Sequence, residues 1–275
     1  MKSERYTILM SIYAREKPAF FLAAMESIRN QTLPPDEIVL VCDGALTKEL
    51  ETAIAQAAIR FHDQLKIIRL ENHVGLGAAL NEGLKACHNE YVARMDTDDI
   101  ACPDRCERQL SYMLQNNLSL CSGTIAEFYD DPNRITSLRR LPEGHDALVQ
   151  FAKRRNPMNH PCTMFQKTSV EAVGGYRNMM LFEDYDLWVR MIQNGAKLGN
   201  CPWVLTLMRT GAGMYGRRGG RDYCRCIFRF FDSLYKNKFI TRREFLENVM
   251  LRCAVSLTPV RLRSLFYRNV LREKI

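Results

Sequence analysis

The stretch Tyr91-Val-Ala-Arg-Met-Asp-Thr-Asp-Asp99 says most about the fold of this chain. Its apolar start, from Tyr91 to Met95, predicts a buried strand, and three carboxylates follow at Asp96, Asp98 and Asp99. Carboxylates this close together repel one another unless a cation lies between them. Hard oxygen ligands at a strand end suit Mg²⁺ or Mn²⁺ bound to a diphosphate, but acidic residues there also cap a following helix. The cluster alone fits both interpretations.

Toward the N-terminus, three strand and helix pairs precede this stretch. Strands are expected over residues 6–13, 37–41 and 66–70, and helices over 18–30, 47–62 and 75–88. Because the strands are continuous apolar runs separated by helices, the pattern is typical of an α/β fold with a mostly parallel central sheet covered by helices on both faces. Ligands bind beyond the carboxyl ends of such strands, where Asp43 and the 96–99 cluster fall.

Toward the C-terminus the pattern is looser. We expect a helix over 103–116, strands near 118–126 and 162–166, a helix from Glu183, an apolar segment at 203–208, a glycine-rich loop at 211–220, and helices over 221–236, 241–256 and 258–274. Residues 1–100 and 101–215 are therefore interpreted as two halves of one domain. Residues 216–275 are interpreted as a basic helical C-terminal extension.

The net charge of +8 is unevenly distributed. From Gly216 onward there are fifteen Lys or Arg residues against five Asp or Glu, so the preceding body is close to neutral. A nucleic-acid binder is usually basic over its binding domain, so no nucleic-acid partner is expected. The pattern favours a neutral catalytic body with a cationic surface attachment.

The ten cysteines include no Cys-x-x-Cys pair, and several lie inside apolar runs, as Cys42 does. Reduced thiols in such positions behave as small hydrophobic side chains, which favours a reducing compartment over a disulfide framework or a zinc site. The first apolar run, residues 6–13, is too short for a signal peptide, and no run is long enough to span a membrane. A cytoplasmic protein is expected.

A second acidic group, Phe182-Glu-Asp-Tyr-Asp-Leu-Trp188, begins the helix expected from Glu183. Carboxylates there favour the helix dipole and need no further role, although a catalytic base is the alternative. His160, before a short strand, is either a ligand contact or a structural hydrogen-bond donor. The Gly75-x-Gly77 pair fits a tight turn better than a phosphate-binding loop, because no third glycine follows.

Together these motifs resemble family 2 glycosyltransferases of the GT-A fold. The similarity runs through Thr7-Ile-Leu-Met-Ser-Ile-Tyr13, Ser27-Ile-x-x-Gln31-Thr32, Val41-Cys-Asp-Gly44, Asn72-x-x-Gly75-Leu-x-x-Ala79-Leu-Asn81-x-Gly83, Met95-Asp-Thr-Asp-Asp99, His160-Pro161, Gly174-Gly-Tyr176 and Glu183-Asp-Tyr-Asp-Leu-Trp188. It covers about residues 5–215. The segment Met214-Tyr-Gly-Arg-Arg-Gly-Gly220 looks like the bacterial exopolysaccharide branch that includes amylovoran-type enzymes.

The resemblance implies a role for each matching position. Ser11, Tyr13 and Asp43 would hold the nucleotide base, Asp96 and Asp98 the rest of the donor nucleotide, and Asp98 and Asp99 a divalent cation, Mn²⁺ or Mg²⁺. Asp184 would be the general base of an inverting transfer. Contacts to the diphosphate or the acceptor would come from His160, Glu183, Trp188, Arg217 and Arg218.

The same resemblance implies the substrates, which are a nucleotide-sugar donor, expected to be a UDP-sugar, and a glycan or lipid-linked glycan acceptor. The chain departs from the family where Cys42-Asp-Gly-Ala45 replaces the common Asp-Asp-Gly-Ser, so one acidic contact near the base is missing. It also lacks the Gln/Arg-x-x-Arg-Trp motif of processive synthases, which implies a single addition. The basic C-terminal helices, above all 258–274, are expected to meet an anionic membrane surface on the cytoplasmic side.

Two other functions fit parts of the pattern. An aspartate-based, Mg²⁺-dependent phosphatase or phosphotransferase would use Asp96 as nucleophile, although that chemistry usually places its motif on an early strand. A non-catalytic protein that binds anions or nucleic acid would account for the basic tail but not for the acidic strand ends.

Overall fold

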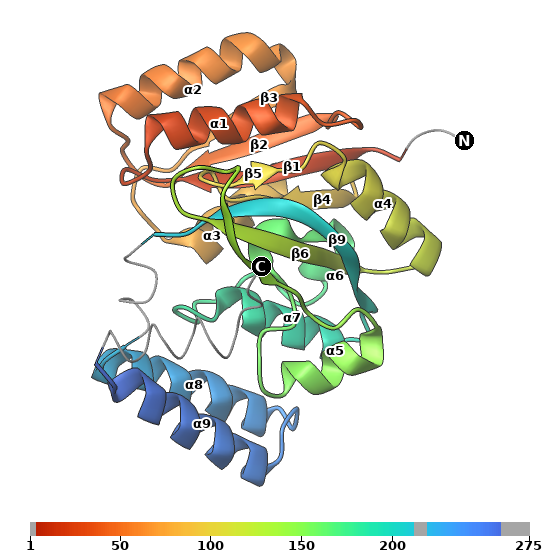
Figure 1. Ribbon diagram of the computed structural model, residues 1–275, viewed down its shortest axis with the longest axis vertical. Helices are drawn as coiled ribbons and strands as arrows, with labels where there is room; N and C mark the ends of the chain where they lie inside the picture. The colour runs from red at the N-terminus through yellow and green to blue at the C-terminus, as the bar shows by residue number, and fades with distance from the viewer. Residues whose placement is uncertain (1–3, 212–218, 260–275) are drawn as a thin grey trace.

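The computed structural model describes residues 4–211 and 219–259, which form one curled sheet covered by helices (Figure 1). Along the sheet the strands follow the order β3 (Leu65–Arg69), β2 (Glu37–Cys42), β1 (Tyr6–Ile12), β4 (Tyr91–Arg94), β8 (Met164–Gln166), β6 (Leu120–Phe128), β9 (Leu198–Arg209) and β5 (Ile100–Ala101). A further strand, β7 (Ile135–Arg139), pairs with β6 outside this path.

Most of these strands run in the same direction. Strands β3, β2, β1 and β4 are mutually parallel, β8 is antiparallel to both β4 and β6, and β9 is parallel to β6. The short strands β5 and β7 run against β9 and β6. The carboxyl ends of β1, β2 and β4 therefore lie side by side at one edge of the sheet, as the sequence predicts.

Helices cover both faces of the sheet, which confirms the expected α/β layering. On one face α1 (Pro18–Arg29), α2 (Lys48–Phe61) and α4 (Arg105–Asn116) pack on Ile8, Met10 and Ile12 of β1. On the other face Leu9 of the same strand packs with α3 (Leu76–Ala86), α5 (His145–Ala152), α6 (Lys167–Glu171) and α7 (Glu183–Gln193). The period of two along β1 sorts its side chains between the two layers.

The C-terminal part of the described chain is a helical hairpin formed by α8 (Arg221–Lys236) and α9 (Arg242–Leu257). Phe230, Ile227 and Tyr223 of α8 pack on Phe182 and Tyr185 at the start of α7, in a third apolar cluster. Thr241 and Glu244 form a reciprocal capping box that fixes the start of α9. Nowhere in residues 4–211 and 219–259 is a helix long and apolar enough to cross a membrane.

The structure adds elements that the sequence pattern does not show. Residues expected to be irregular form β7, α5 and the short α6, and the apolar segment at 203–208 is part of a longer strand, Leu198–Arg209. The helix expected over 258–274 falls almost entirely outside the described residues, and the two described residues of that range, Thr258 and Pro259, are not helical. The glycine-rich loop is likewise described only at its two ends.

Gly83 sets how closely α3 approaches the sheet. A Cβ atom at this position would lie 2.4 Å from a methyl group of Leu9 and 2.7 Å from one of Val41, both of which are fully buried. These distances are shorter than van der Waals contact, so a larger residue would force the helix away from β1 and β2.

We predict that Gly83→Ala lowers the free energy of unfolding by about 1–3 kcal/mol, the usual cost of overpacking a core. Chemical denaturation measures this change. The neighbouring exchange Glu82→Gln, on the half-buried outer side of α3, is the control and should cost less than about 0.5 kcal/mol. Equal midpoints for the two variants would contradict the close approach of α3.

Candidate active site

The three carboxylates that follow β4 gather at the carboxyl edge of the sheet. One oxygen from each of Asp96, Asp98 and Asp99 lies within 4.8 Å of the others. Asp99 is almost completely buried, and its Oδ1 accepts a hydrogen bond of 2.8 Å from the backbone N–H of Arg209 on β9. Its other carboxylate oxygen is also buried and has no hydrogen-bond partner. An unsatisfied buried oxygen beside two further carboxylates is the geometry that a hard cation completes.

The electrostatics of the cluster point the same way. Burial, followed by the negative charge of Asp96, raises the pKa of Asp98 to about 7 and raises the pKa of Asp99 well above its usual range. The charge of Asp96 therefore makes the ionisation of both Asp98 and Asp99 less favourable. The donor set, all carboxylate oxygen, fits Mg²⁺ or Mn²⁺, so the residues present match the cation that the sequence predicts.

Arg94, on β4, is the buried cation nearest to this cluster. Its side chain is 2% exposed, and its Nη2 donates a hydrogen bond to Asp96. The buried Nε and Nη1 atoms have no hydrogen-bond partner. Burial raises the pKa of the Asp184 carboxyl in the other acidic group, and the positive charge of Arg94 is one of the smaller influences that oppose this rise. Arg94 thus lies between the two acidic constellations, and sequence reasoning missed it although an arginine inside an apolar strand was the available signal.

Asp184 lies half-buried in the first turn of α7. Asn156, in the loop after α5, donates a hydrogen bond of 2.6 Å to its Oδ2 atom. Burial raises the pKa of Asp184, and the hydrogen bonds from Asn156 and the backbone of Tyr185 oppose that rise. A partly accessible carboxylate with a raised pKa is suited to accept a proton near neutral pH. Burial also raises the pKa of the neighbouring Glu183.

Tyr176 lies near both acidic groups, the carboxylates of residues 96–99 and Asp184. Its phenol lies close enough to both Asp184 and Asp96 for their negative charges to raise its pKa, in addition to the larger effect of burial. Its hydroxyl is 3.0 Å from Nε2 of His160. The side chain of Asn81 on α3 accepts a hydrogen bond from the backbone N–H of Tyr176 and donates one to its carbonyl, at 2.8 and 2.7 Å.

Two glycines allow this arrangement. A Cβ at Gly175 would lie 2.4 Å from the side-chain oxygen of Asn81, and one at Gly77 would lie 3.3 Å from Cβ of Tyr176. The glycine and asparagine motifs found in the sequence therefore bring α3 against the start of α7. Gly77 serves close packing rather than phosphate binding.

His160 and Trp188 are neighbouring side chains beside Tyr176. Burial and the charge of Arg94 hold the pKa of His160 well below its usual range, so the imidazole is neutral. Trp188 is fully buried, and its ring packs edge-on to those of His160 and Tyr176, with centroids 5.9 and 6.4 Å away. The expectation that Trp188 contacts the diphosphate or the acceptor is therefore wrong, because the ring supports the site from inside the core.

A ring pair lies beyond the carboxyl ends of β1 and β2. Tyr13 and His73 stack with centroids 5.8 Å apart and an angle of 22° between their planes. Nδ1 of His73 lies 2.8 Å from the carboxylate of Asp43, which also accepts hydrogen bonds from the backbone N–H groups of Val74 and Gly75.

The Asp43 carboxylate is only 2% exposed, and its contacts fix the turn before α3 and present His73. A contact between Asp43 and the nucleotide base stays a prediction. Sequence reasoning missed His73 because its partners come from two other strand ends. Ser11, the next-to-last residue of β1, is half-buried.

Arg209, the last residue of β9, lies beside the carboxylate cluster. Its guanidinium packs between the rings of Phe20 and Phe128, 3.8 and 4.6 Å from their centroids. Its Nε donates a hydrogen bond of 3.2 Å to the carbonyl of Asp98. The two arginines expected to reach the donor phosphates, Arg217 and Arg218, lie outside the described residues.

Comparison with known proteins identifies the family to which the chain is similar. The family model described as glycosyl transferase family 2 matches residues 7–174. The amylovoran biosynthesis glycosyltransferase AmsE of Erwinia amylovora is 36% identical over 267 residues, which are 96% of this chain and 98% of that protein. The UDP-Gal:alpha-D-GlcNAc-diphosphoundecaprenol beta-1,3-galactosyltransferase of Escherichia coli is 34% identical over 270 residues, 98% of this chain and 97% of that protein.

The fold is also found among solved structures. The mannosyltransferase PcManGT from Pyrobaculum calidifontis, solved in complex with GDP-Man and Mn²⁺, aligns with 90% of this chain and 69% of its own, with a TM-score of 0.63 at 17% sequence identity. This likeness confirms the GT-A fold expected from the sequence. Together with the family match, it sets aside the phosphotransferase alternative.

We predict that Arg94→Met lowers the free energy of unfolding by about 2 kcal/mol in metal-free buffer, because three neighbouring carboxylates lose their buried counter-charge. Saturating Mn²⁺ should raise the free energy of unfolding of both proteins, and the increase should be larger in the variant than in the parent. Thermal unfolding with EDTA and with Mn²⁺ measures both effects.

The control is Arg108→Met on α4, which removes a partly exposed ion pair with Asp104 and a contact with the ring of Trp203. Such pairs contribute about 0–1 kcal/mol, and no response to Mn²⁺ beyond that of the parent is expected. An Arg94→Met variant as stable as the parent in EDTA would show that Arg94 does not offset the carboxylates.

Proposed function

Because this chain belongs to glycosyl transferase family 2, we propose that it moves one hexose from a UDP-sugar to a hydroxyl of a lipid-linked glycan, with inversion at the anomeric carbon. The chain is a glycosyltransferase of polysaccharide biosynthesis, as its relatives over nearly the whole length show. One observation supports the proposed mechanism most directly. The carboxylates of residues 96–99 and the carboxylate of Asp184 both lie near the buried Arg94.

In the proposed mechanism Asp184 takes the proton from the acceptor hydroxyl. The oxygen then attacks the anomeric carbon from the side opposite the nucleotide, and the bond between that carbon and the diphosphate breaks. Asn156 orients the Asp184 carboxylate through the hydrogen bond to Oδ2. Positioning of this kind turns an encounter of two substrates into a reaction between neighbouring groups.

Asp98 and Asp99 would hold the divalent cation, and Asp96 would contact the donor nucleotide next to it. When bound, the cation supplies positive charge that offsets the negative charge gained by the departing diphosphate. Arg94 keeps Asp96 in place and keeps the site from becoming too negative for a diphosphate to enter. Arg209, beside the cluster, adds a further cation on the β9 side.

The nucleobase is proposed to bind against Tyr13 and His73, because these rings form an exposed surface past the ends of β1 and β2. Stacking on aromatic rings is a general way to bind a base. Uracil and galactose are our first choice of donor groups, since the Escherichia coli relative is named for UDP-Gal. That name also supports a diphosphate-linked sugar on a polyprenol as the acceptor, and a single β-linkage as the product.

The reaction is proposed to take place on the cytoplasmic side of a membrane. All ten cysteines are free thiols, six of them are buried, and burial raises the pKa of Cys87 to about 12. Free thiols are typical of a reducing compartment. A lipid-linked acceptor would bring the enzyme to the membrane surface from that compartment.

The direct test offers the purified chain UDP-Gal, UDP-Glc, UDP-GlcNAc and GDP-Man, each with GlcNAc-diphosphate on a short lipid as acceptor. We expect transfer from a UDP-hexose, a β-linkage in the product by NMR, and loss of activity with EDTA that Mn²⁺ or Mg²⁺ restores. Transfer that is unaffected by EDTA would contradict the metal site. An α-linked product would contradict inversion.

We predict that Asp184→Asn lowers turnover at least about a hundredfold, the usual contribution of a positioned acid or base, while UDP binding measured by calorimetry is unchanged. In the parent enzyme the base must be ionised, and burial raises its pKa. At saturating cation, turnover should therefore fall as the pH falls through a value above the ordinary range of an aspartate.

Glu183→Gln is the matched control, because Glu183 is the adjacent half-buried carboxylate in the same helical turn. It should lower turnover less than tenfold. If the glutamine variant loses turnover and the asparagine variant keeps it, Glu183 is the base and the assignment to Asp184 is wrong.

A further inference from the structure

The outer face of α9 carries a stripe of exposed apolar side chains. Leu246, Met250 and Leu257 are 44%, 63% and 61% exposed, and their spacing places them on one side of the helix. Leu251 is also 64% exposed, although it lies outside this stripe, about a third of a turn around the helix. Large apolar side chains this exposed are unusual when they gather on one surface, and they indicate an interaction site.

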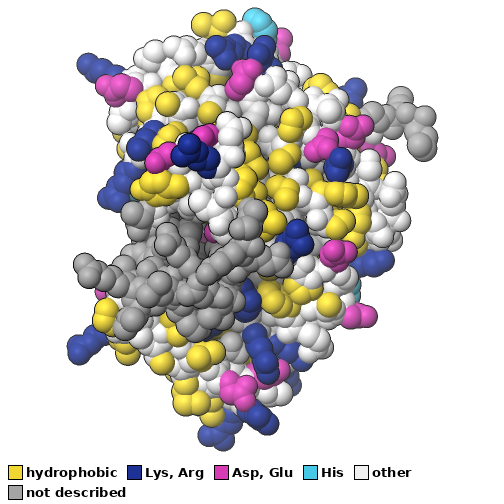
Figure 2. Space-filling view, viewed as in Figure 1, with side chains coloured by type: hydrophobic (Ala, Val, Ile, Leu, Met, Phe, Trp, Pro, Cys, Tyr) yellow, Lys and Arg dark blue, Asp and Glu magenta, His cyan; other side chains and the backbone are white. Residues whose placement is uncertain are grey.

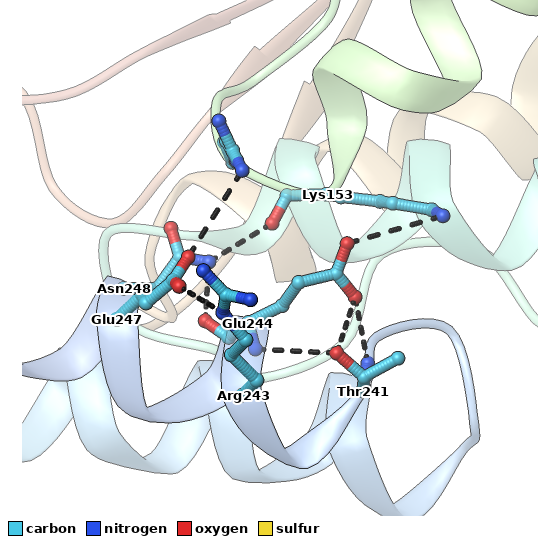
Figure 3. A network of polar contacts seen from close by, with 7 residues as sticks. Lys153, Thr241, Arg243, Glu244, Glu247 and Asn248 are labelled. Carbon is cyan, nitrogen blue, oxygen red and sulfur yellow. Dashed lines mark hydrogen bonds and ion pairs between the residues drawn. The ribbon is translucent and has the colours of Figure 1, made fainter.

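The opposite side of α9 holds the hairpin to the body of the protein (Figure 3). Asn248 donates a hydrogen bond of 3.1 Å to the carbonyl of Lys153, just after α5, and Glu244 forms an ion pair of 4.0 Å with the Lys153 ammonium. Arg154 and Glu247 form a similar pair at 4.0 Å. Because these contacts fix the rotation of α9, the stripe faces away from the catalytic body.

The helix that lies beside α9 presents basic side chains on its exposed side. Arg221 and Arg229 of α8 are exposed, as are Lys238 and Arg242 in the turn and at the start of α9, and none of the four forms an ion pair with another described residue. Figure 2 shows hydrophobic and basic side chains intermixed over the lower end of the molecule, where α8 and α9 lie.

Aromatic side chains fill the junction of the two helices. Phe245 of α9 packs against Phe228 and Tyr235 of α8, with ring centroids 5.7 Å apart in both pairs. Phe228 and Tyr235 are themselves 51% and 40% exposed. The hairpin therefore offers aromatic, aliphatic and cationic groups on one surface, the combination found where a helix lies in the headgroup region of a bilayer.

We propose that the outer surface of the α8–α9 hairpin binds an anionic lipid bilayer, with Leu246, Met250 and Leu257 inserted among the headgroups and the free arginines facing lipid phosphates. The choice of a bilayer rests on the proposed function, because a lipid-linked acceptor is presented there. The sequence places membrane contact on the basic C-terminal helices, above all on 258–274, whereas this surface lies on the two helices before that segment, entirely within described residues.

The charges favour a bilayer over a second copy of the chain. Two such hairpins facing each other would gather eight cations, Arg221, Arg229, Lys238 and Arg242 from each copy, at one interface, and like charges across an interface oppose association. An anionic surface instead attracts each of these cations, and the attraction falls within a Debye length. Binding should therefore weaken as salt is added.

The test is flotation of the full-length protein with vesicles of phosphatidylcholine that contain either no or 30% phosphatidylglycerol. We expect binding to the anionic vesicles at low salt, at least tenfold weaker binding to the neutral ones, and release of most of the protein at high salt. The double variant Met250→Gln, Leu257→Gln should bind at least tenfold more weakly, since two apolar insertions are lost. The double variant Arg229→Gln, Arg242→Gln should also bind anionic vesicles at least tenfold more weakly, but its binding to neutral vesicles should not change.

The matched controls are Ile59→Gln and Lys48→Gln on α2, an exposed apolar and an exposed basic residue at the other end of the molecule. They should leave vesicle binding unchanged. Turnover with a short, water-soluble acceptor should be the same in all variants, so that failure of vesicle binding is separable from failure of the proposed reaction.

Three results would overturn the proposal. They are no binding of the parent to anionic vesicles at low salt, binding that survives both double substitutions, and a dimer in solution that the Met250→Gln, Leu257→Gln variant converts to monomer. The last result would assign the surface to a second copy of the chain.

Discussion

Repulsion among Asp96, Asp98 and Asp99 is the constraint on which the rest of the site depends. Three carboxylates within 4.8 Å of one another, one of them almost fully buried, would destabilise the end of β4 if nothing offset their charge. The protein supplies two cations from separate parts of the sheet, Arg94 from β4 itself and Arg209 from β9. A divalent cation held by Asp98 and Asp99, as proposed, would complete that balance.

Burying Arg94 imposes its own demands on the neighbouring layers. Its carbonyl accepts a hydrogen bond of 2.6 Å from Arg105 at the start of α4, its side chain is 2% exposed, and its charge acts on both His160 and Tyr176. Neutral His160 suits this setting, because a second buried positive charge would be unfavourable. Tyr176 is in turn held by Asn81, so the geometry of the acidic cluster depends on the packing of α3.

The sequence predicts the layering of the fold and the strand-end carboxylates because both follow from local patterns. Continuous apolar runs identify the parallel strands, and Asp43 and the 96–99 cluster come directly after two of them. The partners of those carboxylates are not local. His73 reaches Asp43 through a turn, Asn156 reaches Asp184 across 28 residues, and the strand order that brings β4 beside β8 has no signature in either strand.

Other differences have simple physical causes. The elements α5 and β7 are only eight and five residues long, too short for periodicity to reveal them. Trp188 was misplaced because an aromatic residue in a helix can face the core or a ligand, and the amphipathic pattern of α7 does not separate the two. Its full burial follows only from the tertiary contacts with His160 and Tyr176.

Helix α7 connects the reaction to the proposed membrane surface. Its first turn carries Asp184, while Phe182 and Tyr185 on either side of that turn each pack against Phe230 of α8, with ring centroids 4.6 Å apart. The carboxylate and the hairpin are therefore parts of one packed unit.

Packed helices lie about 8–10 Å apart, so the base is held roughly one helix layer from the face that would meet the lipid. If the hairpin binds the bilayer, the height of the base above the headgroups is set by this aromatic packing rather than by a flexible link. An enzyme built this way is suited to a sugar held close to its lipid by a diphosphate.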